Sequence, residues 1–168
     1  MIVIYTDGAC KKNKRGEDGA SGIGGWAYVV LDKKGEFEDM EIVLSDSNFI
    51  IGTTNQEMEI LAVAEAFKAI KNNYSRKNLI GKKIILYSDS AYVINCLKEK
   101  WYVKWQSNGW KNSKQNPVEN KESWEKLLKS INGFNVDFFH VKRNSTKFIT
   151  MADEMAKEAS KIGTSQEL

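Results

Sequence analysis

The chain has few of the residues that tie a fold together from outside its core. Its 168 residues include two cysteines, one proline and one histidine. Cys10 and Cys96 lack the spacing of a disulfide framework or a thiolate metal site, which favours a reducing compartment. No stretch approaches the ~20 apolar residues that a bilayer span needs. We therefore expect a cytoplasmic protein with no membrane contact.

An excess of charge of one sign is also missing. Lys and Arg total 25 and Asp and Glu total 22, which gives a formal net charge of +3. This balance excludes a polyacidic tail and permits a polyanionic partner without requiring one. The length and a hydrophobic fraction of 42% predict a single domain with a real core. We place this domain at residues 1–162, with a frayed tail at 163–168 and a monomer as the default state.

The hydrophobic pattern predicts an α/β fold that begins with three strands. Apolar and alternating runs predict strands over residues 2–5, 26–31, 37–44, 83–88 and 135–141, with a turn-rich segment at 8–25. Helical spacing predicts helices from Thr54 to Ile70, over 91–97 and 121–130, and around Met151, Met155 and Ala159. Thr54 or Asn55 is able to cap the first of these helices. This order predicts a mixed sheet flanked by helices, with the first strand central.

Four acidic residues occupy positions where these elements are expected to meet. Asp7 and Asp89 end two strands, Glu59 lies in the first turns of the long helix, and Asp153 lies near the start of the last helix. Each alone is typical of a cap or a turn. Together they could converge at the carboxyl edge of the sheet, where a hard divalent cation would relieve their repulsion. The spacing leaves both interpretations open.

The segments that contain these carboxylates resemble the signature segments of ribonuclease H type 1. They read YTDGAC at residues 5–10, TNQEME at 54–59, YSDS at 87–90 and ADEMA at 152–156. The resemblance implies a ribonuclease H-like fold with a five-stranded mixed sheet. It also implies a metal-dependent endonuclease that cuts the RNA strand of RNA–DNA hybrids and leaves 5′-phosphate and 3′-hydroxyl ends.

The same resemblance implies roles for individual residues. Catalysis and the binding of two Mg²⁺, or of Mn²⁺ in their place, fall to Asp7, Glu59, Asp89 and Asp153, with Asp7 bridging the ions. RNA-strand contacts fall to Cys10, Asn13, Asn55 and Gln56. DNA-strand contacts fall to Thr54, Tyr92, Trp101, Lys104, Trp105, Lys111, Ser113 and Asn120. For two of these residues a structural role is the alternative, Asn13 as a turn former and Asn55 as a helix cap.

Residues 98–121 form a basic, tryptophan-rich segment. Residues 101–113 read WYVKWQSNGWKNS, so aromatic residues alternate with lysines and polar residues. Exposed aromatic rings can pack on sugars and bases, and lysines can neutralise phosphates. The resemblance implies a basic protrusion that holds the DNA strand. The alternative is that one of Trp101, Trp105 and Trp110 simply anchors the segment to the core.

Some positions depart from the family pattern. Gly52 stands where a phosphate pocket for the DNA strand has an arginine, so a bidentate contact is lost. Asn144 stands where the family often has a loop histidine that assists product departure, and Thr150 replaces an auxiliary glutamate. The histidine of this chain, His140, falls within the last strand. We expect it to be a packed, hydrogen-bonded residue.

Two other functions stay open from the sequence. An inactive or weakly active hybrid-binding module is favoured by the altered loop, but four intact carboxylates would cost stability without a metal. A resolvase-like or integrase-like core of the same fold would act on DNA. Asn55, Gln56 and the tryptophan-rich segment argue against that reading, because they suit an RNA–DNA hybrid.

Overall fold

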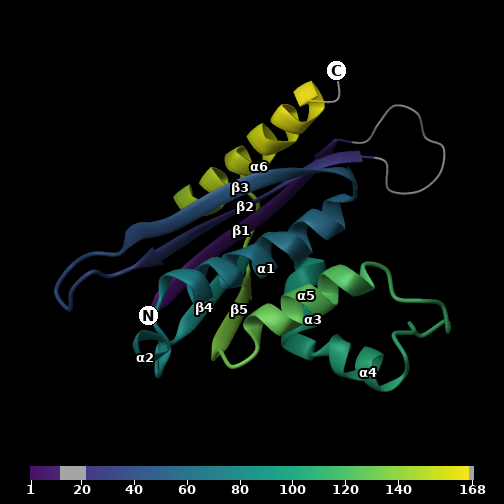
Figure 1. Ribbon diagram of the computed structural model, residues 1–168, viewed down its shortest axis with the longest axis horizontal. Helices are drawn as coiled ribbons and strands as arrows, with labels where there is room; N and C mark the ends of the chain where they lie inside the picture. Colours follow the sequence, from purple (N-terminus) through teal and green to yellow (C-terminus); the bar gives the residue numbers. More distant parts are fainter. Residues whose placement is uncertain (12–21, 167–168) are drawn as a thin grey trace.

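The computed structural model describes residues 1–11 and 22–166, and within them the strands form a five-stranded mixed sheet (Figure 1). The strands are β1 (Ile2–Lys11), β2 (Gly22–Asp32), β3 (Glu41–Thr53), β4 (Ile84–Ser88) and β5 (Val136–His140). Their order is β3-β2-β1-β4-β5, with β2 antiparallel to β1 and β3, and β4 parallel to β1 and β5. The predicted mixed sheet with a central first strand is confirmed.

Helices cover both faces of this sheet. They are α1 (Asn55–Asn73), α2 (Arg76–Leu79), α3 (Ala91–Glu99), α4 (Trp101–Ser107), α5 (Lys121–Ile131) and α6 (Lys147–Gln166). Figure 1 shows α6 on one side of the sheet and α1, α3, α4 and α5 on the other. Within the described part of the chain, no helix has the length and apolar character needed to span a bilayer.

The main core lies between the sheet and α1. Phe67 of α1, Leu86 of β4 and Trp124 of α5 are fully buried there. The helix α1 begins where Thr54 caps it, because the Oγ1 atom of Thr54 accepts a hydrogen bond from the amide of Glu57 at 3.2 Å. The cap is thus Thr54, and Asn55 is the first residue of the helix.

The first three strands are longer than the sequence predicted. Part of the expected turn at 8–25 is strand, because β1 continues to Lys11 and β2 begins at Gly22. The third strand was predicted at 37–44 but covers Glu41–Thr53. It is an edge strand with many exposed polar side chains, so it lacks the apolar alternation of a half-buried strand.

The C-terminal helix extends further than expected. We predicted fraying from residue 163, but α6 continues to Gln166. Gly163 is buried, and a Cβ atom added there would lie 2.7 Å from Ile23 and 2.8 Å from the ring of Phe49. This packing against β2 and β3 holds the last turns of α6, which a hydrophobic pattern cannot reveal because glycine adds no apolar side chain.

Glycines let two helices approach the sheet backbone closely. A Cβ atom at Gly8 of β1 would lie 2.6 Å from the amide nitrogen of Glu59 in α1. A Cβ atom at Gly25 of β2 would overlap the carbonyl oxygen of Ala156 in α6. Real Cβ contacts do not come this close, so both positions exclude larger residues.

Replacing Gly25 by alanine should lower the free energy of unfolding by about 1–3 kcal/mol, because the new methyl group overlaps helix backbone that cannot rotate away. Chemical denaturation followed by circular dichroism measures this change. Gly35→Ala is the matched control, since its Cβ would lie 3.4 Å from the flexible side chain of Glu38. Equal stability of the two variants would contradict the close packing of α6 on β2.

Candidate active site

Asp7 and Asp89 lie where the parallel pairing of β1 and β4 ends. The last paired residues are Thr6 and Ser88, and each aspartate follows directly after one of them. We had predicted that Asp7 ends its strand. This prediction is wrong, because β1 continues along β2 to Lys11. The end of the parallel pairing, and not the end of β1, therefore brings the two aspartates together.

Glu59 joins this pair because α1 packs closely on β1. The close approach at Gly8 places the second turn of α1 directly over Asp7, and the amide of Gly8 donates a hydrogen bond to Oδ1 of Asp7 at 2.8 Å. Carboxylate oxygens of Asp7, Glu59 and Asp89 all lie within 4.8 Å of one another. Three chain segments thus place three carboxylates in one cluster.

Asp153 reaches the same cavity from α6. The cavity, of about 420 Å³, is lined by Asp7, Gly8, Ala9, Asn55, Glu59, Asp89, Ser90, Arg143, Asp153 and Lys157. Oδ2 of Asp153 lies 2.7 Å from Nζ of Lys157, and Oδ1 lies 3.7 Å from Nη2 of Arg143. The structure therefore brings together the four carboxylates that the sequence singled out, together with two basic residues that it did not.

Burial sets the electrostatics of the cluster. Burial raises the pKa of Asp7 to about 8, aided by repulsion from Asp89 and by the neighbouring carboxyl group of Asp153. Burial and the charges of Asp7 and Asp89 likewise raise the pKa of Glu59. Burial alone would also raise the pKa of Asp153, but the ammonium group of Lys157 and the neighbouring carboxyl group of Asp7 hold it below its ordinary value.

The cluster fits a divalent cation. Oδ2 of Asp7 and Oε2 of Glu59 are buried and have no hydrogen-bond partner among the residues that the structure describes. Buried polar atoms normally have partners, and hard cations such as Mg²⁺ take oxygen ligands of this kind. The donor set of closely spaced carboxylate oxygens is therefore suited to Mg²⁺ or Mn²⁺.

Of the residues predicted to contact the RNA strand, Asn55 is one that lines this cavity. Asn55 and Gln56 are exposed in the first turn of α1, and Asn55 lines the cavity itself. Cys10 lies on β1 with its Sγ atom 3.5 Å from the carbonyl oxygen of Thr53. Asn13 lies outside the described residues.

The tryptophans of residues 98–121 pack on one another and on the core. The ring centroid of Trp105 lies 5.9 Å from the ring centroids of both Trp110 and Trp124. The ring centroid of Tyr92 lies 6.2 Å from that of Trp101 and 5.8 Å from that of Trp124. Trp124 is fully buried, and the three tryptophans of the segment are partly buried against the core. All three tryptophans therefore anchor the segment to the core, whereas the alternative that we considered from the sequence was that one of them does.

The polar residues predicted to contact the DNA strand are more accessible. Lys104, Lys111 and Ser113 are exposed, whereas Asn120 is partly buried. Lys100 lies between α3 and α4 in the left-handed conformation, with φ 55° and ψ 45°, so one residue sets the bend between the two helices. Gly52 has φ 80°, which favours glycine over the arginine of the family pattern.

The last strand and the following loop differ from our expectation. Nε2 of His140 lies 3.1 Å from the carbonyl oxygen of Asp89, but the side chain is exposed and not packed as predicted. In the loop, Arg143 lines the carboxylate cavity, while Asn144 is exposed in the left-handed region at φ 57°. The hydrogen bond was expected, but its partner Asp89 was not identified, because that contact depends on the parallel register of β4 and β5.

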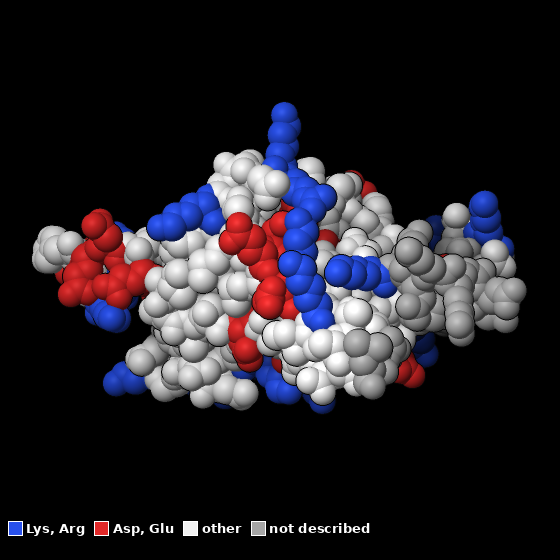
Figure 2. Space-filling model, turned by 90° about the horizontal axis from the view of Figure 1, so that it is seen from above, with Lys and Arg blue, Asp and Glu red and all other residues white. Residues whose placement is uncertain are grey.

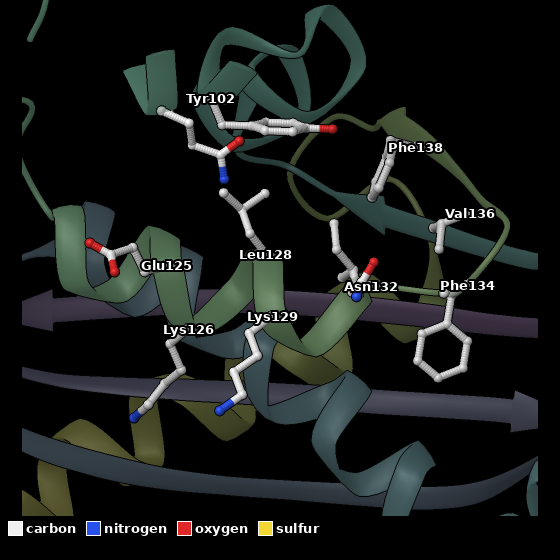
Figure 3. A pocket seen from close by; sticks show the side chains of 12 residues that line it. Tyr102, Glu125, Lys126, Leu128, Lys129, Asn132, Phe134, Val136 and Phe138 are labelled. Carbon is white, nitrogen blue, oxygen red and sulfur yellow. The ribbon is translucent and has the colours of Figure 1, made fainter. Parts of the chain in front are cut away.

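A larger cavity of about 870 Å³ lies away from the carboxylates, between α4, α5 and β5. Figure 3 shows Tyr102, Leu128 and Phe138 around it, and Lys126 and Lys129 of α5 also line it. Its walls are mostly apolar and contain one acidic residue, Glu125. It does not have the carboxylate chemistry of the smaller cavity.

Solved structures of other proteins share this fold. The structure of LC9-RNase H1, a type 1 RNase H with the type 2 active-site motif, matches with a TM-score of 0.80 and 24% identity, over 96% of this chain and 72% of that chain. LC11-RNase H1 in complex with an RNA/DNA hybrid matches with a TM-score of 0.67 and 22% identity, over 98% and 99% of the two chains. The fold is that of the type 1 ribonucleases H.

Sequence comparison assigns the family. The family model for RNase H matches residues 1–161. Ribonuclease H of Thermoanaerobacter sp. (strain X514) is 39% identical over 167 residues, which cover 99% of this chain and 94% of the relative. The chain belongs to the ribonuclease H family.

The raised pKa of Asp7 predicts how pH affects the metal-free protein. The folded state retains a proton that the unfolded state loses above its ordinary pKa of 3.8. Stability should therefore fall as the pH rises from about 4 to about 8. Asp7→Asn removes this charge and should raise Tm in EDTA at about pH 8 by roughly 3 °C or more, with the difference vanishing near pH 4.

Thermal melts across this pH range measure the effect, with Glu158→Gln as a control for the loss of one exposed acidic charge on α6. A gain in Tm that is the same at all pH values would show that ionisation of Asp7 does not destabilise the folded protein.

Proposed function

We propose that this protein is a metal-dependent endonuclease that hydrolyses the RNA strand of RNA–DNA hybrids to 5′-phosphate and 3′-hydroxyl products. The observation that carries this proposal is the meeting of Asp7, Glu59, Asp89 and Asp153 in one cavity of a ribonuclease H-family chain. The hybrid complex of LC11-RNase H1, which has the same fold, supports the substrate class.

The carboxylates would hold two ions of Mg²⁺ or Mn²⁺. Asp7, Glu59 and Asp89 would hold one ion, and Asp7 and Asp153 the other, so that Asp7 bridges them. The buried oxygens of Asp7 and Glu59 that lack a partner among the described residues support this assignment. When bound, such ions make water a better nucleophile and neutralise charge that develops on the phosphate and the leaving 3′ oxygen.

Neighbouring groups contact the carboxylate of Asp7 and the backbone around Asp89. The Gly8 amide fixes one oxygen of Asp7, and His140 contacts the carbonyl oxygen of Asp89. The amide of Ser90 donates to Oγ of Ser88 at 3.1 Å, which shapes the turn that carries Asp89. Preorganised groups of this kind do not need to reorganise during the reaction.

Contacts outside the cluster would position the hybrid. Asn55 and Gln56, exposed beside the cavity, are suited to hydrogen-bond the 2′-hydroxyl that distinguishes RNA from DNA. Cys10 and Asn13 are further proposed contacts to the RNA strand. Proposed contacts to the DNA strand are Thr54, Tyr92, Trp101, Lys104, Trp105, Lys111, Ser113 and Asn120. Of these, the exposed lysines are best placed to neutralise phosphates, because the rings pack on the core.

A cytoplasmic location and a monomeric state belong to the same proposal. Cys96 is buried in the core and burial raises the pKa of its thiol to about 12, so it is kept unreactive. A thiol of this kind and a cysteine spacing untypical of disulfides favour a reducing compartment.

We expect the protein to cut labelled RNA–DNA hybrid with Mg²⁺ and to leave duplex DNA and single-stranded RNA intact. Asp7→Asn should lower kcat by about 1,000-fold or more while the hybrid Kd stays within about threefold, because groove and phosphate contacts lie apart from the cluster. Gel assays and binding titrations measure both. Asp46→Asn on the exposed edge strand is the control.

Each alternative outcome has a defined meaning. Residual activity of Asp7→Asn within about tenfold of wild type, or ~1.4 kcal/mol of barrier, would contradict the proposed role of Asp7. Binding of hybrid without cleavage by the wild type would indicate a binding module. Cleavage of duplex DNA would indicate a DNA-acting core of the same fold.

Replacing Lys104 and Lys111 together by alanine should raise KM for the hybrid by about three- to tenfold and leave kcat nearly unchanged, because uniform binding is lost. The slope of log KM against log salt should flatten by up to about 2, since two phosphate contacts are removed. Steady-state assays over a salt series measure both effects. The matched control is the pair Lys33→Ala and Lys77→Ala, exposed lysines outside the protrusion. An unchanged salt slope would show that residues 98–121 have a structural role and that their lysines do not contact the phosphates of the hybrid.

A further inference from the structure

Asp153 differs from the other three carboxylates because basic side chains already neutralise it. Its side chain is 10% exposed, and Lys157, one helical turn further along α6, places Nζ 2.7 Å from Oδ2. Arg143 approaches the other oxygen at 3.7 Å, from a side chain that is 61% exposed. Both basic residues line the carboxylate cavity. Figure 2 shows Lys and Arg side chains beside Asp and Glu side chains near the middle of the face that carries α6.

The other carboxylates meet a different environment. Asp7, Glu59 and Asp89 form the group whose oxygens lie within 4.8 Å of one another. Two of their buried oxygens, on Asp7 and Glu59, have no hydrogen-bond partner within residues 1–11 and 22–166. Among the described residues these three carboxyl groups form no ion pair with a basic side chain, whereas a cation at Asp153 meets an ammonium group already in place.

We propose that Lys157 is an internal counter-ion, which occupies the Asp153 end of the site until a second divalent cation displaces it. This inference rests on the proposed function, because it concerns the same carboxylates. The first ion binds among Asp7, Glu59 and Asp89 without displacing a protein cation. The second ion binds between Asp7 and Asp153 only when the ammonium of Lys157 moves away, so the two ions bind with unequal affinity.

The side chain of Lys157 is suited to this exchange. It is 46% exposed, so the ammonium group can move into solvent on its flexible four-carbon stem without disturbing the core. An ordinary exposed ion pair one turn apart on a helix would contribute little. Here the carboxylate is buried beside Asp7, and removing the ammonium leaves that negative charge for a metal ion to neutralise.

The test is a titration of the full chain with Mn²⁺ alone, without nucleic acid, in which electron paramagnetic resonance measures the free Mn²⁺. Wild type should bind a first ion at lower concentration than a second. Lys157→Met keeps the length of the side chain and removes its charge, and it should lower the midpoint for the second ion by about three- to tenfold. The midpoint for the first ion should change by less than about twofold, since that ion displaces no ammonium.

Two control variants separate a local effect from a general one. Lys161→Met removes the same charge one turn further along α6, outside the residues that line the cavity, and should bind like wild type. Lys157→Arg keeps the charge and should also bind like wild type. Circular dichroism confirms that each variant is folded.

The possible failures are distinguishable. Identical isotherms for wild type and Lys157→Met, or an equal gain in Lys161→Met, would overturn the counter-ion role while leaving the metal site intact. A wild type that binds no Mn²⁺, or binds it no better than Asp7→Asn, would overturn the metal site and the counter-ion role together.

Discussion

Repulsion between carboxylates that cannot reach water is the constraint on which the rest of this structure depends. Asp7 and Glu59 are buried, and with Asp89 their oxygens lie within 4.8 Å of one another. Ionising these groups so close together is unfavourable, which raises the pKa values of Asp7 and Glu59, so the surrounding scaffold must be rigid enough to resist their separation. The central position of β1 and the close packing of α1 at Gly8 supply that rigidity. The stability of the sheet and of the packing of α1 thus keeps these carboxyl groups close together at the candidate active site.

The sequence predicted those elements whose side-chain pattern is set by burial. The helix α1 was evident because Ile60, Val63, Phe67 and Ile70 follow helical spacing, and all four are fully buried. The strand β4 was evident as a short apolar run. The long edge strand β3 was missed over most of its length, because exposed polar residues such as Asp46 and Asn48 give no alternating apolar pattern.

The site was predictable in its acidic residues but not in their partners. Asp7, Glu59, Asp89 and Asp153 stood out by position and by resemblance to the family segments. The pairing of Lys157 and Arg143 with Asp153, and the contact of His140 with Asp89, depend on the rotation of α6, the loop path and the register of β5. A lysine one turn after an aspartate is common on exposed helices, so only the burial of Asp153 gives this pair a meaning.

The junction at Lys100 has a consequence for the proposed function. One residue in the left-handed conformation sets the angle between α3 and α4, and ring contacts to the buried Trp124 hold the arm that follows. Residues 98–121 and the elements that carry Asp7 and Glu59 are therefore joined to the same hydrophobic core. On the proposed function, the distance along the duplex between the phosphate contacts of residues 98–121 and the carboxylates, and not the base sequence, decides where the RNA strand is cut.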